Sequence, residues 1–319
     1  MSTAGRHGRH TVVTGGAGFV GSHLCTTLLD QGYSVTCVDD YCTGSAANVA
    51  HLVDRPGFTI RRADVAKGLD ITERMEMVFH LASPASPMDY LRLPVHTLEA
   101  GSLGTRNALA LAQRHGARFL LASTSEVYGN PLQHPQSENY WGNVNPVGPR
   151  SVYDEAKRFA EALTAAMASA HGVNTAIVRL FNTYGPGMRS HDGRAVPTFV
   201  RQALAGQPLT VTGDGSQTRS LTYVDDTVEG ILAMAHSDLA GPVNIGSDIE
   251  FTMAELADFI IELTSSRSHI EFVERPTDDP AVRRPDITLA RGKLRWEPRT
   301  SVREGLERTI TWFREHPEA

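Results

Sequence analysis

The amino-acid sequence predicts an α/β fold, a doubly wound Rossmann-type parallel sheet with a smaller C-terminal α/β lobe. Three observations lead to this prediction. A glycine-rich turn near the N-terminus joins a β-branched segment to an amphipathic one, short apolar runs alternate with helical stretches, and those runs lack a polar face. Strands of this kind are typical of a parallel sheet that helices cover on both sides.

The first half of the chain supplies most of the expected sheet. Residues 11–14 are β-branched and end at Gly15, which predicts a buried strand followed by a turn. Residues 19–31 have helical apolar spacing, and Gly32 suits the C-terminal cap of that helix. Further strands are predicted at residues 34–38, 58–61, 77–81, 119–122, 176–181, 209–212 and 242–245.

A change in amino-acid composition near residue 182 predicts a domain boundary. Beyond it glycine, proline and charge become frequent, and residues 274–287 read as a charged, proline-rich loop. Helices are predicted at residues 198–204, 225–236, 252–264 and 301–314. We expect a disordered polar tail at residues 1–10, a Rossmann domain at 11–182 to which 220–248 return, and a lobe formed mostly by 183–319.

Composition and charge argue against several functions. The 319 residues carry 30 basic and 36 acidic side chains, so the net charge is 30 − 36 = −6, whereas a duplex nucleic-acid binder needs a basic face. Cys25, Cys37 and Cys42 form no CxxC pair, so neither a disulfide framework nor a metal site is expected. There is no visible signal peptide and no apolar run near the roughly 18 residues of a membrane span. We expect a cytoplasmic protein that binds neither membranes nor nucleic acids.

The glycine-rich turn predicts a dinucleotide site. Gly15, Gly18 and Gly21 lie where glycine permits a tight turn, close approach of a pyrophosphate and close helix packing. The helix that follows offers free N–H groups to phosphates. Asp39 comes 21 residues after Gly18, at the end of the second strand, where a carboxylate binds ribose hydroxyls and repels a 2′-phosphate. We therefore predict NAD rather than NADP as the cofactor; the alternative is a structural turn and a solvated aspartate.

The other predicted cofactor contacts follow the carboxyl ends of the strands. Residues 64–65 end the third strand and flank the expected adenine position, and residues 81–84 end the fourth strand, where the crevice holds the cofactor. The predicted cofactor-binding residues are Gly15, Gly18, Phe19, Val20, Asp39, Asp40, Thr43, Gly44, Asp64, Val65, Leu81, Ser83, Tyr153, Lys157 and Thr183.

A YxxxK pair predicts acid–base chemistry. Tyr153 and Lys157 share one face of a helix, and an ammonium near a phenol stabilises the phenolate and lowers its pKa. Such a pair can remove a proton from a sugar hydroxyl while a cofactor takes the hydride. The pattern also occurs by chance on surface helices, but here it follows the glycine turn and a Ser-Thr-Ser-Glu tract at residues 123–126.

Several motifs resemble a known group of enzymes. TGGAGFVGSH, STSEVYG at residues 123–129 and YDEAK at 153–157 are similar to the extended short-chain dehydrogenase/reductase superfamily of nucleotide-sugar enzymes. Within it, HLASPASPMDY, HPQSENYWGNVNPVGPRSVYDEAKR, GDGSQTRSLTYVDD and RRPDI resemble the UDP-glucuronate decarboxylase family, whose product is UDP-xylose. The resemblance runs from about residue 11 to residue 313.

The resemblance implies a reaction with no net redox change and no metal. Tyr153 takes the proton of the C4 hydroxyl of UDP-glucuronate while NAD accepts the C4 hydride. The resulting ketone lies β to the C6 carboxylate, so CO2 leaves and C5 is protonated. The hydride then returns, which gives UDP-xylose.

The resemblance also implies residue roles. Lys157 tunes Tyr153, Thr124 binds the C4 oxygen, Ser125 and Glu126 lie near C5 and C6, and Arg283 lies by the carboxylate or the C5 protonation site. Related 4,6-dehydratases have Asp-Glu where this chain has Ser-Glu. A serine cannot protonate a leaving C6 hydroxyl, which favours decarboxylation over dehydration. The implied substrate-binding residues are Pro84, Ser86, Tyr90, Asn107, Asn182, Arg194, Arg219 and Arg283.

Two positions depart from the family pattern. Gly187 stands where the family usually has the arginine of GPRM, and Arg189 is a candidate replacement for the missing charge. Gly101 stands where an asparagine is usual, which removes an expected polar contact near the cofactor.

Assembly and several alternative functions are further expectations. The resemblance implies a homodimer through a four-helix bundle made by residues 98–114 and 153–170. Alternative activities are a decarboxylase that releases UDP-4-keto-pentose, a sugar-nucleotide 4,6-dehydratase and a 4-epimerase. A more distant alternative is a non-catalytic protein that senses a dinucleotide or binds RNA.

Overall fold

The computed structural model describes residues 9–317. Most of the tail expected at residues 1–10 therefore lies outside the described residues, although His10 already belongs to the first strand. Within the described chain no helix is both long and apolar enough to cross a bilayer.

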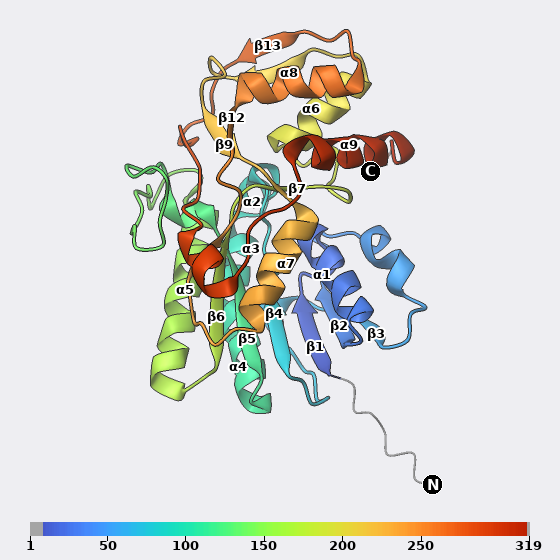
Figure 1. Cartoon of the computed structure of the whole chain (residues 1–319). Helices are drawn as coiled ribbons and strands as arrows, with labels where there is room; N and C mark the ends of the chain where they lie inside the picture. The colour runs from blue at the N-terminus through green and yellow to red at the C-terminus, as the bar shows by residue number, and fades with distance from the viewer. Residues whose placement is uncertain (1–8, 318–319) are drawn as a thin grey trace.

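The predicted parallel sheet is confirmed. Seven parallel strands lie in the order β11-β6-β5-β4-β1-β2-β3 (Figure 1). The strands are β1 (His10–Thr14), β2 (Ser34–Asp39), β3 (Phe58–Arg62), β4 (Met77–His80), β5 (Arg118–Thr124), β6 (Thr175–Leu180) and β11 (Val243–Ile245). The chain order reverses between β1 and β4, and ligands of such sheets bind beyond the carboxyl ends of the strands at this reversal.

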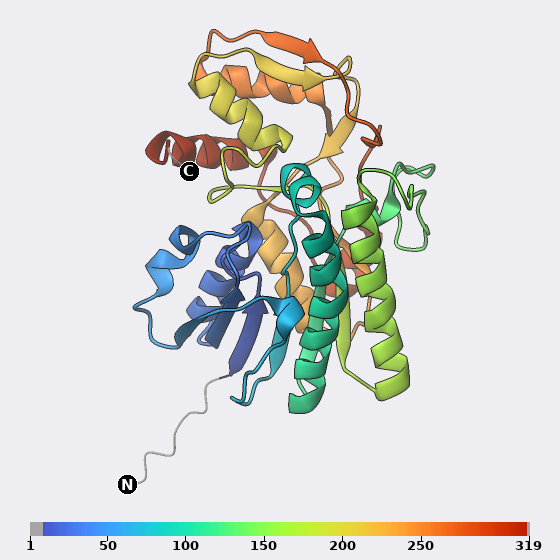
Figure 2. The same cartoon turned by 180° about the vertical axis from the view of Figure 1, so that it is seen from behind.

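Helices cover both faces of the sheet. On one face α1 (Phe19–Asp30) packs against α7 (Val224–Ala235), and on the other α4 (Thr105–His115) packs against α5 (Ser151–His171) (Figures 1 and 2). Successive residues of a strand point to opposite faces of the sheet. Val13 belongs to the hydrophobic core on the α1 side, and Val12 belongs to the core on the α4 side. The central strands are buried on both faces, which explains why they carry no polar alternation.

The helix predicted at residues 98–114 is built in three pieces. These are α3 (Pro94–Glu99), a π-helical turn (Ala100–Gly104) and α4. A Cβ on Gly101 would lie 2.6 Å from the Cβ of Ala156 on α5. Gly101 therefore lets the π-helical turn pack tightly against α5, a space that an asparagine side chain would not fit.

The smaller lobe lies above the carboxyl ends of the sheet strands (Figure 1). Its helices are α6 (Ala195–Leu204), α8 (Met253–Thr264) and α9 (Val302–Glu315). Its strand pairs are β8 (Leu209–Thr212) with β13 (Ile270–Val273), and β9 (Thr218–Ser220) with β12 (Glu250–Thr252). The strand predicted at residues 209–212 is β8, and it pairs with β13 in the lobe.

Short elements connect the two parts. β7 (Thr183–Tyr184) pairs with β10 (Thr222–Tyr223), after which α7 and β11 rejoin the large sheet. The remaining elements are α2 (Pro87–Arg92) and the short turns η1 (Ala46–Leu52), η2 (Val65–Lys67), η4 (Ser125–Tyr128) and η5 (Ala290–Leu294). The chain thus crosses between sheet and lobe more than once, so that the cleft between them has walls from both.

Candidate active site

The glycine turn between β1 and α1 forms a cradle for an anion. Gly15 has φ of +71°, and a Cβ there would lie 2.7 Å from the amide nitrogen of Ala82 beyond β4. A Cβ on Gly21 would lie 2.1 Å from the carbonyl oxygen of Gly15. Gly18 is the N-cap of α1, and no side chain of the described residues caps it. The free N–H groups at this helix end fit a pyrophosphate.

Asp39 ends β2 beside this cradle. Its carboxylate accepts hydrogen bonds from the backbone amides of Ala17 at 3.0 Å and Tyr41 at 2.9 Å. Burial raises the pKa of Asp39, and these two hydrogen bonds oppose the rise. The carboxylate therefore ties the glycine turn to the end of β2, at the place where the sequence predicts the ribose.

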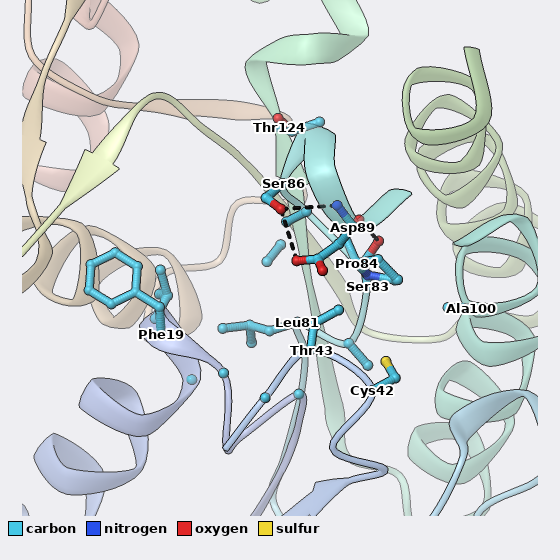
Figure 3. A pocket seen from close by; sticks show the side chains of 18 of the residues that line it. Phe19, Cys42, Thr43, Leu81, Ser83, Pro84, Ser86, Asp89, Ala100 and Thr124 are labelled. Atoms are coloured by element: carbon cyan, nitrogen blue, oxygen red, sulfur yellow. Dashed lines mark hydrogen bonds between the residues drawn. The ribbon is translucent and has the colours of Figure 1, made fainter. Parts of the chain in front are cut away.

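One cleft brings most of the predicted residues together. It runs from the glycine turn past β4 and β5 to α5 and the lobe (Figure 3). The predicted residues that line it are Gly15, Gly18, Phe19, Val20, Asp39, Asp40, Thr43, Gly44, Asp64, Val65, Leu81, Ser83, Pro84, Ser86, Thr124, Ser125, Glu126, Tyr153, Lys157, Asn182, Thr183 and Arg194. The cleft lining does not include Tyr90, Asn107, Arg219 or Arg283.

Tyr153 and Lys157 lie one helical turn apart on α5 and both are buried. The Lys157 ammonium donates a hydrogen bond to the carbonyl oxygen of Ala122 at 2.9 Å, and burial lowers its pKa to about 8. Burial raises the pKa of Tyr153 to about 12, while the hydroxyl of Thr124 and the charge of Arg194 oppose the rise. The sequence predicted that Lys157 lowers this pKa, but in the structure burial outweighs the neighbouring groups.

Glu126 is held between two arginines at the end of β5. Its Oε2 accepts a hydrogen bond from Arg150 at 2.8 Å, and its Oε1 pairs with Arg283. Burial alone would raise the pKa of Glu126, but the charges of Arg283 and Arg150 lower it to about 2. Arg283 is 1% exposed and also donates to the carbonyl oxygen of Gly129 at 2.8 Å and to Ser125 Oγ at 3.4 Å.

The ring of Tyr90 packs against the ring of Tyr153. The Tyr90 and Tyr153 rings stack with centroids 5.3 Å apart and planes 4° from parallel. This contact restrains the ring plane of Tyr153. The Tyr90 hydroxyl is buried and finds no partner among residues 9–317.

Two arginine–carboxylate pairs line the mouth toward the lobe. Arg194 donates to Asp192 at 2.8 Å, and Arg189 pairs with Asp89. Ser86 donates to Asp89 at 2.8 Å and caps α2 (Figure 3). The sequence did not single out either aspartate, because only the fold brings residue 89 to residue 189. Gly187 has φ of +84°, a conformation that suits glycine and not the arginine usual at this position.

Two predicted substrate residues have other partners in this structure. Arg219 donates to both carboxylate oxygens of Asp279, at 3.0 and 3.1 Å. Asn107 donates to the carbonyl oxygens of Val65 and Ala66, so it supports the η2 turn. Asn182 differs, because its Nδ2 lies by the cleft with no partner among the described residues.

One group of side chains at the Asp39 end could hold a metal ion. Asp40, Cys42 and His96 offer ligand atoms that lie within 4.8 Å of one another. Nε2 of His96 is 3.2 Å from Oδ2 of Asp40. Burial, and then the neighbouring Asp40, raise the pKa of the Cys42 thiol to about 12. The three residues line the same cleft, and their sequence spacing gave no sign of the grouping.

Comparison with known proteins identifies the family. A family model described as the NAD dependent epimerase/dehydratase family matches residues 11–246. The chain belongs to this family. Membership in this family confirms the predicted fold class, the enzymatic nature of the protein and NAD as its cofactor.

Individual proteins similar to this chain have more specific names than the family. UDP-glucuronic acid decarboxylase 1 of Arabidopsis thaliana is 50% identical over 310 residues, which cover 97% of this chain and 71% of that protein. UDP-glucuronic acid decarboxylase 1 of Danio rerio is 48% identical and covers 96% and 72%. The crystal structure of UDP-glucuronic acid 4-epimerase from Bacillus cereus, with UDP-glucuronic acid and NAD, has a TM-score of 0.86 at 26% identity and covers 96% and 99%.

Proposed function

We propose that this protein is an NAD-dependent UDP-glucuronate decarboxylase that forms UDP-xylose. The observation that carries the proposal is the identity of about 50% to decarboxylases of this substrate over nearly the whole chain. The tract Thr124-Ser125-Glu126 at the end of β5, with Glu126 paired to Arg283, argues in addition against a 4,6-dehydratase.

The residues around Tyr153 suit proton transfer at C4 of the sugar. NAD, when bound, accepts the C4 hydride and returns it, and its positive nicotinamide favours the phenolate form of a nearby tyrosine. Tyr153 takes the C4 hydroxyl proton at its phenolic oxygen, and the Thr124 hydroxyl beside it orients the C4 oxygen. Lys157 is anchored on Ala122, with its ammonium 6.0 Å from the centre of the Tyr153 ring.

The charge around Glu126 suits loss of CO2. Glu126 is ionised at neutral pH because two arginines hold it so. A second carboxylate next to it is disfavoured by like-charge repulsion, and the loss of C6 as neutral CO2 relieves that repulsion. Ser125 has no acidic proton to give to a leaving C6 hydroxyl, so the site is poorly suited to a 4,6-dehydration.

The lobe side of the cleft suits the UDP part. Arg194, Arg189 and the unpartnered amide of Asn182 lie at this end, and the planar fork of arginine fits a diphosphate. Arg219 joins them when a phosphate replaces Asp279 as its partner. The glycine turn and Asp39 supply the NAD end, so the two anionic ligands meet at Tyr153.

A 4-epimerase is the strongest competing function. The structural neighbour from Bacillus cereus binds UDP-glucuronic acid and NAD and is named a 4-epimerase. Such an enzyme keeps the carboxylate, because it only transfers the C4 hydride to the other face. Ser125 and Glu126 do not distinguish the two activities by themselves, so the products have to be analysed.

Incubation with UDP-glucuronate alone tests the proposal. We expect CO2 release, UDP-xylose as product and no net reduced nicotinamide, which would absorb in the near ultraviolet. Reduced nicotinamide that rises in step with CO2 would indicate a decarboxylase releasing UDP-4-keto-pentose. An NAD-loaded preparation that releases no CO2 would overturn the decarboxylase assignment.

We also propose a homodimer. Val95, Leu98 and Leu103 project from α3 and the π-helical turn, and Phe159 projects from the adjacent α5; all four are exposed. Apolar side chains grouped on one outer face favour association with a second copy. The contact of α3 with α5 in one chain supplies two of the four helices of the expected bundle.

A further inference from the structure

A second cavity lies behind Glu126. It has a volume of about 220 Å³ and is lined by polar groups of η4, the start of α5 and two loops, including Asn130, Asn143 and Asp278. Among residues 9–317, Glu126 is the one residue that lines both this cavity and the main cleft. A polar cavity of this size holds water, since one water molecule occupies roughly 30 Å³ in the liquid.

Asp154 forms part of the wall of this cavity. The residue is 5% exposed, and its Oδ1 atom is buried with no hydrogen-bond partner among the described residues. A buried carboxyl oxygen without a partner is costly, and either a water molecule or a proton relieves that cost. Asp154 belongs to the same helical turn as Tyr153, although it faces the second cavity.

The charges around Asp154 come from every side. Glu126 and Arg150 share its cavity, Arg283 lies behind Glu126, Glu155 is its neighbour on α5, and Asp278 lies across the cavity. The neutral phenols of Tyr90 and Tyr153 complete the surroundings. Burial, and then the charge of Glu126, raise the pKa of Asp154 to about 7, against the lowering effect of Arg150 and Arg283.

The proposed decarboxylation consumes one proton in each turnover. When the C5–C6 bond breaks, CO2 leaves and the electron pair stays as an enolate over C4 and C5, which must take a proton at C5. The proton on Tyr153 is not available for C5, because it returns to the C4 oxygen. Glu126 cannot store the proton either, since its pKa of about 2 keeps it ionised.

We propose that the second cavity delivers the C5 proton from solvent, with Asp154 holding it at Oδ1 and cavity water carrying it past Glu126 to the sugar. This inference rests on the proposed decarboxylase function. It assigns a role to an unpartnered carboxyl group and to a water-filled space that the binding of substrate and cofactor does not explain.

The replacement Asp154→Asn tests the proposal, since it preserves volume and removes the titratable group. In the wild type we expect kcat to fall as the pH rises through about 7, because the acid form of Asp154 is lost. In D154N we expect kcat to be lower by on the order of ten- to a hundredfold below that pH, the pH step to disappear, and the solvent deuterium isotope effect on kcat to increase. The control D258N makes the same change at an exposed position on α8, outside both cavities, and should retain the wild-type profile.

Two further measurements test the proposal in other ways. The first does not depend on activity, and the second leaves Asp154 itself unchanged. The infrared spectrum of the protein without substrate should contain a carboxylic-acid carbonyl band that disappears as the pH rises through about 7 and is absent in D154N. The variant Val144→Trp, which fills the cavity, should lower kcat and leave KM and the infrared band unchanged.

The outcomes separate the two proposals. A wild type that makes no CO2 from UDP-glucuronate would sink the proposed function, whatever the infrared result. A wild type that makes UDP-xylose while D154N keeps its kcat and pH profile would overturn only the proton route, as would the absence of the titrating band.

Discussion

Glu126 remains negatively charged inside the site because Arg283 and Arg150 surround it. Each arginine in turn depends on Glu126, since Arg283 is almost fully buried and a buried charge without a partner is costly. The three side chains come from η4, the start of α5 and the loop before η5. Their pairing therefore holds the loop before η5 against the end of β5.

Glu126→Gln tests this pairing through stability. We expect a loss of about 3 kcal/mol near neutral pH, the size typical of breaking one side of a buried pair. The lowered pKa means that the stabilisation is present above the usual glutamate pKa and is lost as the pH falls through about 2. Urea unfolding of both proteins measures the loss. The control Glu304→Gln removes an exposed partner of Arg308 and should cost under about 1 kcal/mol.

Tyr153→Phe tests the proposal that Tyr153 is the base. The ring keeps its stack on Tyr90, so we expect the variant to fold and to bind NAD with near wild-type affinity. Turnover should fall by at least about a hundredfold, because no other group is placed to take the C4 proton. Isothermal titration with NAD and a UDP-glucuronate assay measure the two quantities. A variant with near wild-type turnover would remove Tyr153 as the base.

At the scale of elements, two close approaches between backbones determine the site. One is the glycine turn against α1 and Ala82, and the other is the π-helical turn against α5 at Gly101. Sequence pattern predicted the first, because the spacing of Gly15, Gly18 and Gly21 has a known physical cause. It did not predict the second, because the proximity of Gly101 to Ala156 depends on tertiary packing.

Gly21→Ala tests the first close approach. The new methyl group would overlap the carbonyl oxygen of Gly15, so the turn has to move away from the helix N-terminus. We expect NAD affinity to fall at least about tenfold and the melting temperature to decrease. Gly292→Ala is the matched control, since a Cβ there meets no described atom within 4 Å. Equal NAD affinity for G21A and wild type would show that the turn tolerates the displacement.

The length and burial of the strands and helices explain which of them could be predicted from the sequence. Strands buried on both faces and long helices gave signals strong enough to predict all seven strands of the main sheet and the principal helices. Strands such as β7 and β10 have two residues each, too few for any periodicity. Arg150 and Asp89 were missed as site residues because only folding brings them to Glu126 and Arg189. Asp192 lies two residues from its partner Arg194, but no motif marked it.

For the whole molecule, repeated crossing of the chain between sheet and lobe brings distant residues to one cleft (Figure 1). The net charge of −6 does not prevent binding of anionic ligands, because Arg189 and Arg194 act locally at the mouth. Each is balanced by its own aspartate in the ligand-free protein. Composition could therefore argue against a nucleic-acid groove, but it could not locate this pocket.

Assembly belongs to this scale as well. Phe159→Asp introduces a charge on the outer face of α5, so we expect the homodimer to dissociate into monomers. Sedimentation velocity measures the change. The control Leu132→Asp alters a more exposed apolar residue in a different region and should remain dimeric. A wild type that is monomeric at micromolar concentration would contradict the proposed dimer.

The central claim is that this site removes C6 of UDP-glucuronate as CO2 and returns the sugar as UDP-xylose. UDP-glucuronate labelled with carbon-13 at C6 tests it directly by nuclear magnetic resonance of the complete reaction. We predict that all converted label appears as CO2 and bicarbonate while the nucleotide sugar becomes an unlabelled pentose. Label retained in a six-carbon UDP-sugar would contradict the claim and favour a 4-epimerase.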